Sequence, residues 1–125
     1  MKITTFNPLI VTRDPENAIR LFEEMGFEKR HTKKGIGETG ITDVRMKNAD
    51  GFCVDVAQGS GEWTMIRINV DDYDEAIAFL TAHGFRKPRH ETAGNKVDTG
   101  TSVFTIMVAP SGFIVAVSQH IRDQD

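Results

Sequence analysis

One glycine pattern in this sequence could bind a phosphate. GIGETG, from Gly35 to Gly40, matches G-x-G-x-x-G, the fingerprint of dinucleotide-binding proteins. In those proteins the third glycine opens a helix, and the N-terminus of that helix holds the pyrophosphate. Here the next residues are ITDVRMKN, which alternate with period two and predict a strand. We therefore predict a connecting loop, whose only role would be that of a movable rim around a binding site.

Histidine and cysteine side chains could bind a metal or act as nucleophiles. His31 and His90 fall on predicted strands at positions that do not match, His83 ends a predicted helix, and His120 lies near the C-terminus. We predict surface or capping roles for all four. Cys53 is the only cysteine and lies on an apolar strand without a matched histidine. It predicts a small buried thiol with no catalytic role, and no intrachain disulfide is possible.

Two segments of similar sequence pattern are predicted to be helices, and they belong to the framework that positions any functional side chains. The first is DPENAIRLFEEMGF, with Asp14 suited to the N-cap and Gly26 to the exit. The second is DYDEAIAFLTAHGF, with Asp72 and Gly84 in the same roles, 58 positions later. Each carries an apolar stripe at helical spacing. The stripes comprise Ala18, Ile19, Leu21, Phe22 and Met25 in the first segment, and Ala76, Ile77, Phe79 and Leu80 in the second.

The strands repeat as well. DGFCVDV and SGFIVAV align with a shift of 61, so Gly51 matches Gly112. The chain therefore reads βαβββ twice, with strands predicted at about 3–12, 27–33, 41–48 and 51–58, then 63–70, 85–91, 101–109 and 112–119. A chain of 125 residues predicts a single domain, with module 1 at about 1–58 and module 2 at about 62–120.

This duplicated unit resembles the glyoxalase and bleomycin-resistance family of the vicinal oxygen chelate superfamily. The motifs that carry the resemblance are VTRDPENAIRLFEEMGF, NVDDYDEAIAFLTAHGF and APSGFIVAV. The resemblance implies an α+β fold in which two βαβββ modules form a curled, cup-shaped, eight-stranded mixed sheet with the helices outside. It also implies a homodimer, in which the cup is either formed within one chain or completed across the interface.

Active members of this family hold one divalent metal with four side chains, usually His, Gln or Glu. The resemblance places those positions at Asn7 and Met65 on the first strand of each module, and at Asp55 and Ala116 on the fourth. Of these four side chains, only the aspartate is a good ligand for a hard metal. We therefore expect no metal, no other cofactor and no catalytic residue of the family type.

If Asn7 and Asp55 face the cup, strand alternation brings Trp63, Met65 and Arg67 to the same side, and Ala116 with them. The opposite parity is apolar and is expected to pack on the helices: Phe52, Val54, Val56, Ile66, Ile68, Val70, Phe113, Val115 and Val117. Arg67 needs a partner there, either Asp55 or a ligand carboxylate or phosphate. Trp63 either stacks on a ligand or packs at a dimer interface. Asp43 and Arg45 either line the cup or face solvent.

Composition excludes several classes of protein. A net charge of −3 without a basic stripe argues against nucleic acid as a partner. No apolar run approaches the length of a membrane span, and the N-terminus lacks the apolar region of a signal peptide. We expect a soluble cytoplasmic protein.

Three functions remain open. The first is a metal-free protein that binds a small anionic or aromatic molecule through Asn7, Asp55, Trp63, Met65, Arg67 and Ala116, for sequestration or resistance. The second is a metal-dependent lyase or isomerase of the glyoxalase or dioxygenase type. The third is a structural or regulatory homodimer whose cup has no ligand.

Overall fold

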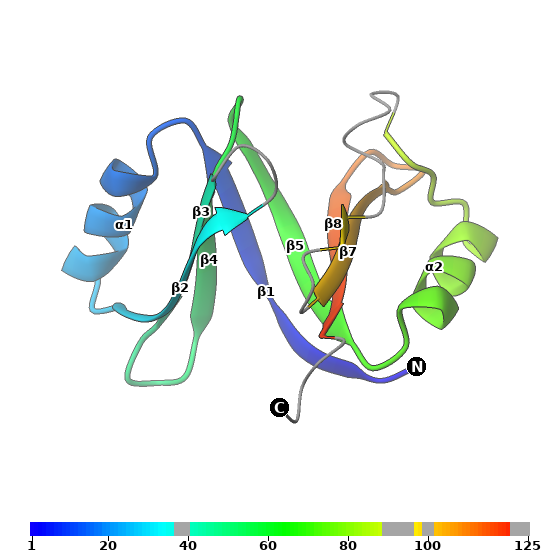
Figure 1. Ribbon diagram of the computed structural model, residues 1–125, viewed down its shortest axis with the longest axis horizontal. Helices are drawn as coiled ribbons and strands as arrows, with labels where there is room; N and C mark the ends of the chain where they lie inside the picture. Colours follow the sequence, from blue (N-terminus) through cyan, green and yellow to red (C-terminus); the bar gives the residue numbers. More distant parts are fainter. Residues whose placement is uncertain (37–40, 89–96, 99–101, 121–125) are drawn as a thin grey trace. The chain divides into compact units, whose positions relative to one another are not determined.

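The computed structural model describes the backbone of residues 1–36, 41–88, 97–98 and 102–120, and the side chains of 1–30, 43–88 and 103–120. These residues form an α+β architecture of two helices and mixed β-sheet, as the sequence predicts (Figure 1). The chain divides into two compact units. We call Asn7–Thr64 the N-terminal unit, and Met65–Asp125 together with Met1–Phe6 the C-terminal unit. Neither helix of the described residues is long and apolar enough to cross a bilayer.

In the N-terminal unit the strand order is β2-β3-β4-β1. Its elements are β1 (Ile3–Thr12), α1 (Pro15–Glu24), β2 (Glu28–Ile36), β3 (Ile41–Lys47) and β4 (Cys53–Gln58). Strand β1 runs parallel to β4, whereas β3 is antiparallel to both of its neighbours. Helix α1 lies against β4. The core between them comprises Ile19, Val44, Met46, Val54 and Val56, with Ile10, Ala18, Phe22 and Phe27 at its edge.

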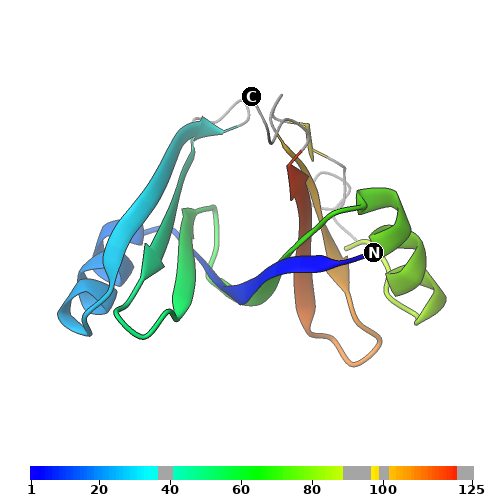
Figure 2. The same ribbon diagram turned by 90° about the horizontal axis from the view of Figure 1, so that it is seen from below.

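In the C-terminal unit the strand order is β5-β8-β7-β6, and the first residues of β1 lie beside β5, where the Thr4 hydroxyl donates to the Asn69 carbonyl. Its elements are β5 (Trp63–Val70), α2 (Tyr73–Ala82), β6 (Val97–Asp98), β7 (Ser102–Val108) and β8 (Ile114–His120). Helix α2 lies against β7 and β8, as α1 lies against β4 in its own unit (Figure 2). The core comprises Ile68, Val70, Tyr73, Ala76, Leu80, Val103, Met107, Val115 and Val117.

The predicted helix boundaries are confirmed. The Asp14 carboxylate accepts from the Asn17 amide at 3.3 Å, and the Asp72 carboxylate accepts from the Glu75 amide at 3.0 Å. Gly26 and Gly84 follow the two helices with φ of +103° and +89°, a conformation that glycine adopts without strain. Both helices therefore begin and end where local chemistry alone places them.

The prediction of eight full strands is not confirmed. Among the described residues, seven strands have six or more residues, and β6 has two. The strand predicted at 85–91 is wrong over its described part, because only Arg86 pairs there, as an isolated bridge to Val108. Pro88 has no N–H to donate, which explains why the pairing stops. Residues 89–96 and 99–101 lie outside the described residues.

The helix-packing face is confirmed along the strands but not at its ends. Phe52 and Phe113 were expected to pack on the helices, yet they are 67% and 51% exposed, because each belongs to the turn that precedes its strand. In the apolar stripes, Leu21, Met25 and Phe79 are also exposed. Each helix rests on its sheet along a band narrower than its apolar surface.

The glycine pattern at Gly35 precedes a strand, as predicted. Gly35 and Ile36 end β2, and β3 begins at Ile41, which pairs with Ile36. No helix N-terminus follows the third glycine, so a pyrophosphate would lack its usual binding group. The rim proposed for residues 37–40 lies outside the described residues.

Candidate functional site

The face of the N-terminal unit that points away from α1 gathers polar side chains from three strands. Strand β4 places Asp55 opposite Leu9 of β1 and opposite Arg45 of β3. Directly paired residues project to the same side of a sheet. Asn7, two residues before Leu9, shares that side. This face therefore carries an acid, a base and an amide within reach of one another.

A short hairpin turn fixes this arrangement. The Asn48 side chain accepts from the amides of Asp50 and Phe52, and Gly51 takes a φ of +90°. The turn sets Lys47 opposite Cys53, and two residues further along each strand it sets Arg45 opposite Asp55. The local sequence of the turn therefore decides which charges meet.

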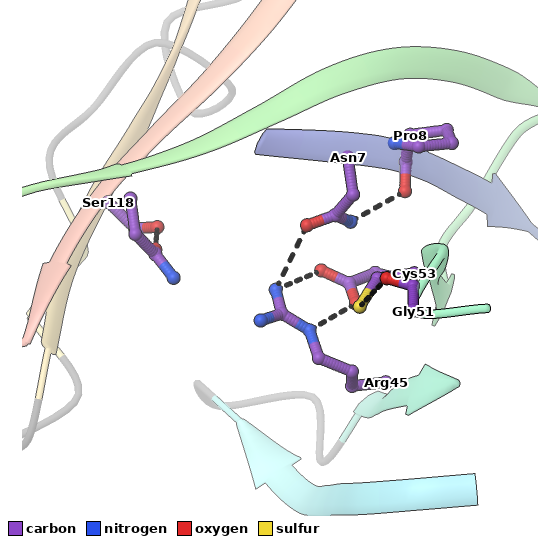
Figure 3. Close-up of polar contacts among 8 residues, drawn as sticks. Asn7, Pro8, Arg45, Gly51, Cys53 and Ser118 are labelled. Carbon is purple, nitrogen blue, oxygen red and sulfur yellow. Dashed lines mark hydrogen bonds and ion pairs between the residues drawn. The ribbon is translucent and has the colours of Figure 1, made fainter. Parts of the chain in front are cut away.

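The Arg45 guanidinium holds the Asp55 carboxylate with two parallel hydrogen bonds (Figure 3). Nε donates to Oδ1 at 2.7 Å and Nη2 donates to Oδ2 at 2.8 Å. Nη2 also donates to Oδ1 of Asn7 at 3.3 Å, and the Asn7 amide nitrogen donates to the Pro8 carbonyl at 2.9 Å. A bidentate arginine–carboxylate pair of this kind is both strong and rigid.

Burial makes this pair mutually dependent. The side chain of Asp55 is 1% exposed and that of Arg45 is 27% exposed. A carboxylate out of water needs a cation and hydrogen bonds to remain charged. The hydrogen bond that Arg45 donates to Asp55 raises the pKa of Arg45, against the opposing effect of burial. Arg45 therefore stays cationic, and Asp55 occupies the edge of the guanidinium formed by Nε and Nη2.

In the C-terminal unit three of the predicted site residues lie together. Arg67 on β5 pairs in register with Ala116 on β8, and Met65 precedes Arg67 by two residues on the same strand face. Met65 and Ala116 are buried, and Arg67 is partly buried. Further along this face the Ser118 hydroxyl hydrogen-bonds the Asn69 side chain. The proposed pairing of Arg67 with Asp55 or with a ligand stays a prediction.

The remaining residue of the predicted ligand-binding set is Trp63, which is 48% exposed at the start of β5. A Cβ added at Gly61 would lie 2.6 Å from its ring, so the indole covers that glycine. Cys53, expected to be buried, is partly exposed at the first position of β4. Neither observation assigns a role to these two side chains.

Sequence reasoning missed Arg45, which it left between the cup wall and solvent. The signal was present in the sequence. Counting outward from the turn at Asn48–Phe52 places Arg45 opposite Asp55, since a hairpin pairs residues at equal distances from its turn. His83, by contrast, lies where it was expected, at the C-cap of α2, with Nδ1 2.9 Å from the Phe79 carbonyl.

The chain has the vicinal oxygen chelate fold, as the sequence motifs suggested. Methylmalonyl-CoA epimerase from Streptomyces coelicolor, solved in complex with 2-nitronate-propionyl-CoA, matches with a TM-score of 0.60 and 18% identity, over 96% of this chain and 99% of the other. A glyoxalase/bleomycin resistance protein/dioxygenase superfamily member from Vibrio splendidus 12B01 matches with a TM-score of 0.59 and 16% identity, over 94% and 99%.

Glyoxalase I from Zea mays matches with a TM-score of 0.65 and 14% identity, over 94% of this chain and 43% of the longer maize chain. The sequence matches no family model and no curated protein. These similarities establish the fold. Any function must be inferred from the residues of this chain.

The metal that the fold family implies does not fit the residues at the corresponding positions. In the N-terminal unit, Arg45 already engages both oxygens of Asp55 and the amide oxygen of Asn7. In the C-terminal unit, Met65 offers a soft thioether and Ala116 offers no ligand atom. Within the described residues, no three His, Cys, Asp or Glu side chains gather into a group that could hold a metal ion. A divalent metal would have to displace a guanidinium to reach its one hard ligand.

Proposed function

We propose that this chain is a glyoxalase-fold protein that binds a small organic molecule, and that it does so without a divalent metal. One observation carries the proposal: the bidentate Arg45–Asp55 pair stands where the resemblance places a metal ligand. A carboxylate neutralised in this way is a poor metal ligand and a weak general base. Binding, in contrast, needs only a few fixed polar anchors on an otherwise apolar surface.

The proposal assigns the ligand-binding role to Asn7, Asp55, Trp63, Met65, Arg67 and Ala116, with Arg45 added. The fold supports this assignment in general terms, since one neighbour of the same fold was solved with a coenzyme A derivative. The proposal includes a cytoplasmic homodimer that serves in sequestration or resistance. Analytical ultracentrifugation tests the dimer separately from the ligand.

A second candidate is a metal-dependent lyase or isomerase of the glyoxalase or dioxygenase type. The named fold neighbours favour it, because an epimerase and a glyoxalase are among them. The residues at the four family metal positions argue against it, because they lack a set of good ligands: Asn7, Asp55, Met65 and Ala116. The two candidates differ in one measurable property, which is the dependence of ligand binding on metal.

A thermal-shift screen separates them. The metal-free protein is screened with small aromatic and anionic compounds, and the screen is repeated with Zn²⁺, Ni²⁺ or Mn²⁺. We expect compounds that raise the melting temperature of the metal-free protein, with no further rise when a metal is present. Stabilisation that requires a metal would instead favour the enzyme. The absence of any stabilising compound would favour a structural or regulatory homodimer.

A further inference from the structure

Arg45 has a hydrogen-bonding edge that its protein partners leave open. An arginine side chain carries five N–H donors, on Nε, Nη1 and Nη2. Asp55 takes one from Nε and one from Nη2, and Asn7 takes the other from Nη2. Within the part of the chain that the structure describes, Nη1 makes no hydrogen bond. Because Asp55 takes the edge formed by Nε and Nη2, Nη1 lies on the opposite side of the planar guanidinium.

Arg45 is the most exposed member of this cluster, so its open edge is the part that a ligand in solvent can reach. Asn7 and Asp55 are 4% and 0% exposed, whereas the Arg45 side chain is 27% exposed. The anchors are thus shut away from solvent while part of the arginine reaches it. The two hydrogen bonds of the bidentate pair hold the guanidinium plane, so little side-chain entropy remains to be lost when a ligand binds.

We propose that Nη1 of Arg45 receives an anionic oxygen of the ligand, either a carboxylate or a phosphate oxygen. The inference rests on the proposed function and makes it specific. Asp55 then serves as the rigid support of the arginine, and the ligand itself is met by Arg45. A hydrogen bond between a guanidinium and an anionic oxygen is among the stronger polar contacts in proteins. Neutral oxygens gain less from the same donor, so the site selects for anions.

The direct test uses three ring-matched probes: benzoate, phenyl phosphate and benzamide. The Arg45 Nε–H signal is assigned by its loss in Arg45→Lys and followed by ¹⁵N NMR in the wild type. Benzoate or phenyl phosphate should shift it saturably, and benzamide should leave it unchanged. A larger shift with one anion identifies the carboxylate or the phosphate as the natural group. Equal shifts with benzamide, or no shift with either anion, would overturn the proposal.

The matched variant is Arg45→Lys, which keeps a cation beside Asp55 but loses the planar fork. Its affinity for the effective anion should fall at least about tenfold. Arg30→Lys is the control, because Arg30 is an exposed arginine of the same unit. A compound from the thermal-shift screen that binds wild type and Arg45→Lys equally would defeat this inference and leave the proposed function intact. If Arg45→Lys does not fold, the Nε–H signal is assigned by triple-resonance NMR of the wild type, and the wild-type titration then decides alone.

Discussion

The two hairpins β3–β4 and β7–β8 have nearly the same backbone and opposite chemistry. In both turns the glycine, Gly51 or Gly112, takes a positive φ, and its amide donates to the carbonyl three residues earlier. Arg45 pairs with Asp55 in the first hairpin, and the equivalent pair in the second is Ile106 with Ala116. The turn therefore fixes the geometry, and the side chains at the paired positions decide whether that face is polar.

The fully buried polar side chains of the two hairpins, Asp55 and Thr105, lie on opposite faces of their sheets. In the N-terminal unit Asp55 lies away from the helix, paired with Arg45. In the C-terminal unit a hydrogen bond joins the Tyr73 hydroxyl of α2 to Thr105, on the helix side. The position equivalent to Thr105 in the first hairpin is Val44, which is buried in the core. A duplicated fold can thus place its buried polar contacts independently in each half.

The largest effect is expected when the N-terminal pair is broken. Asp55→Ala leaves the partly buried Arg45 without its counter-charge and should lower the free energy of unfolding by about 3 kcal/mol. The double variant Arg45→Ile with Asp55→Ala copies the second hairpin, so it should recover most of that loss. Chemical denaturation measures both. A double variant as unstable as the single one would show that the two hairpins are not interchangeable.

The second prediction concerns positions where the two hairpins agree. Met46 and Met107 are equivalent, at 0% and 2% exposure, and both lie in the cores beneath the helices. Each Met→Ala change should lower the free energy of unfolding by about 3 kcal/mol, through lost burial and the cavity left behind. Urea denaturation of the two variants compares them directly. Very unequal losses would mean that the two cores differ in packing despite their common pattern.

A smaller effect is expected on the helix side of the C-terminal unit. Burial raises the pKa of Tyr73, and Thr105 is 1% exposed. Tyr73→Phe leaves the Thr105 hydroxyl without this partner and should cost about 1–2 kcal/mol. Adding Thr105→Val restores the apolar pattern of the first hairpin and should recover part of that cost. If Tyr73→Phe is neutral in thermal denaturation, this hydrogen bond contributes little to stability.

The smallest expected effect is a pH dependence that arises from Glu62 in the N-terminal unit. In the N-terminal unit the Glu62 carboxylate accepts from the Arg13 amide at 3.0 Å, whereas in the C-terminal unit the neutral Gln119 side chain accepts from the Tyr73 amide. The bond from Arg13, assisted by the Thr12 hydroxyl, lowers the pKa of Glu62. A lowered pKa in the folded state gives stability above the ordinary glutamate pKa, and this stability is lost as pH falls through the folded value.

Glu62→Gln tests this pH dependence. The variant should be slightly less stable than the wild type at pH 7. The difference should shrink as pH falls below the ordinary glutamate pKa, and it should vanish once pH lies below the lowered pKa of Glu62 in the folded protein. Melting temperatures of both proteins across the acid range provide the measurement. If the difference in melting temperature persisted unchanged at low pH, the effect would come from the altered packing or hydrogen bonding of the side chain and not from the charge of Glu62.

The sequence predicted those features that depend on neighbouring residues. Asp14 and Asp72 cap the helices, and Gly26 and Gly84 end them, because a cap needs only a few consecutive residues. The alternation of apolar and other residues along each strand predicted the helix-facing core, because this pattern too depends only on nearby residues. The predicted strand at 85–91 is wrong over its described part, because Pro88 has no N–H to donate to a neighbouring strand.

The candidate site was harder to predict because its key contact joins two strands. The motif positions led to Asn7 and Asp55, and both lie in the polar cluster. Arg45, which organises that cluster, lies outside the three motifs that carry the resemblance. It is found only when the hairpin register is counted from its turn. Partners across a sheet depend on register, which a pattern along one strand does not contain.

The central claim is that Arg45 occupies the place of a metal at Asp55, and elemental analysis tests it most directly. The purified protein is equilibrated with Mn²⁺, Ni²⁺ and Zn²⁺ in turn, desalted, and measured for metal content per chain. Arg45→Ala serves as the comparison, because it removes the resident cation from Asp55. We expect the wild type to retain far less than one equivalent of any of the three metals. Retention of one equivalent per chain by the wild type would contradict the account.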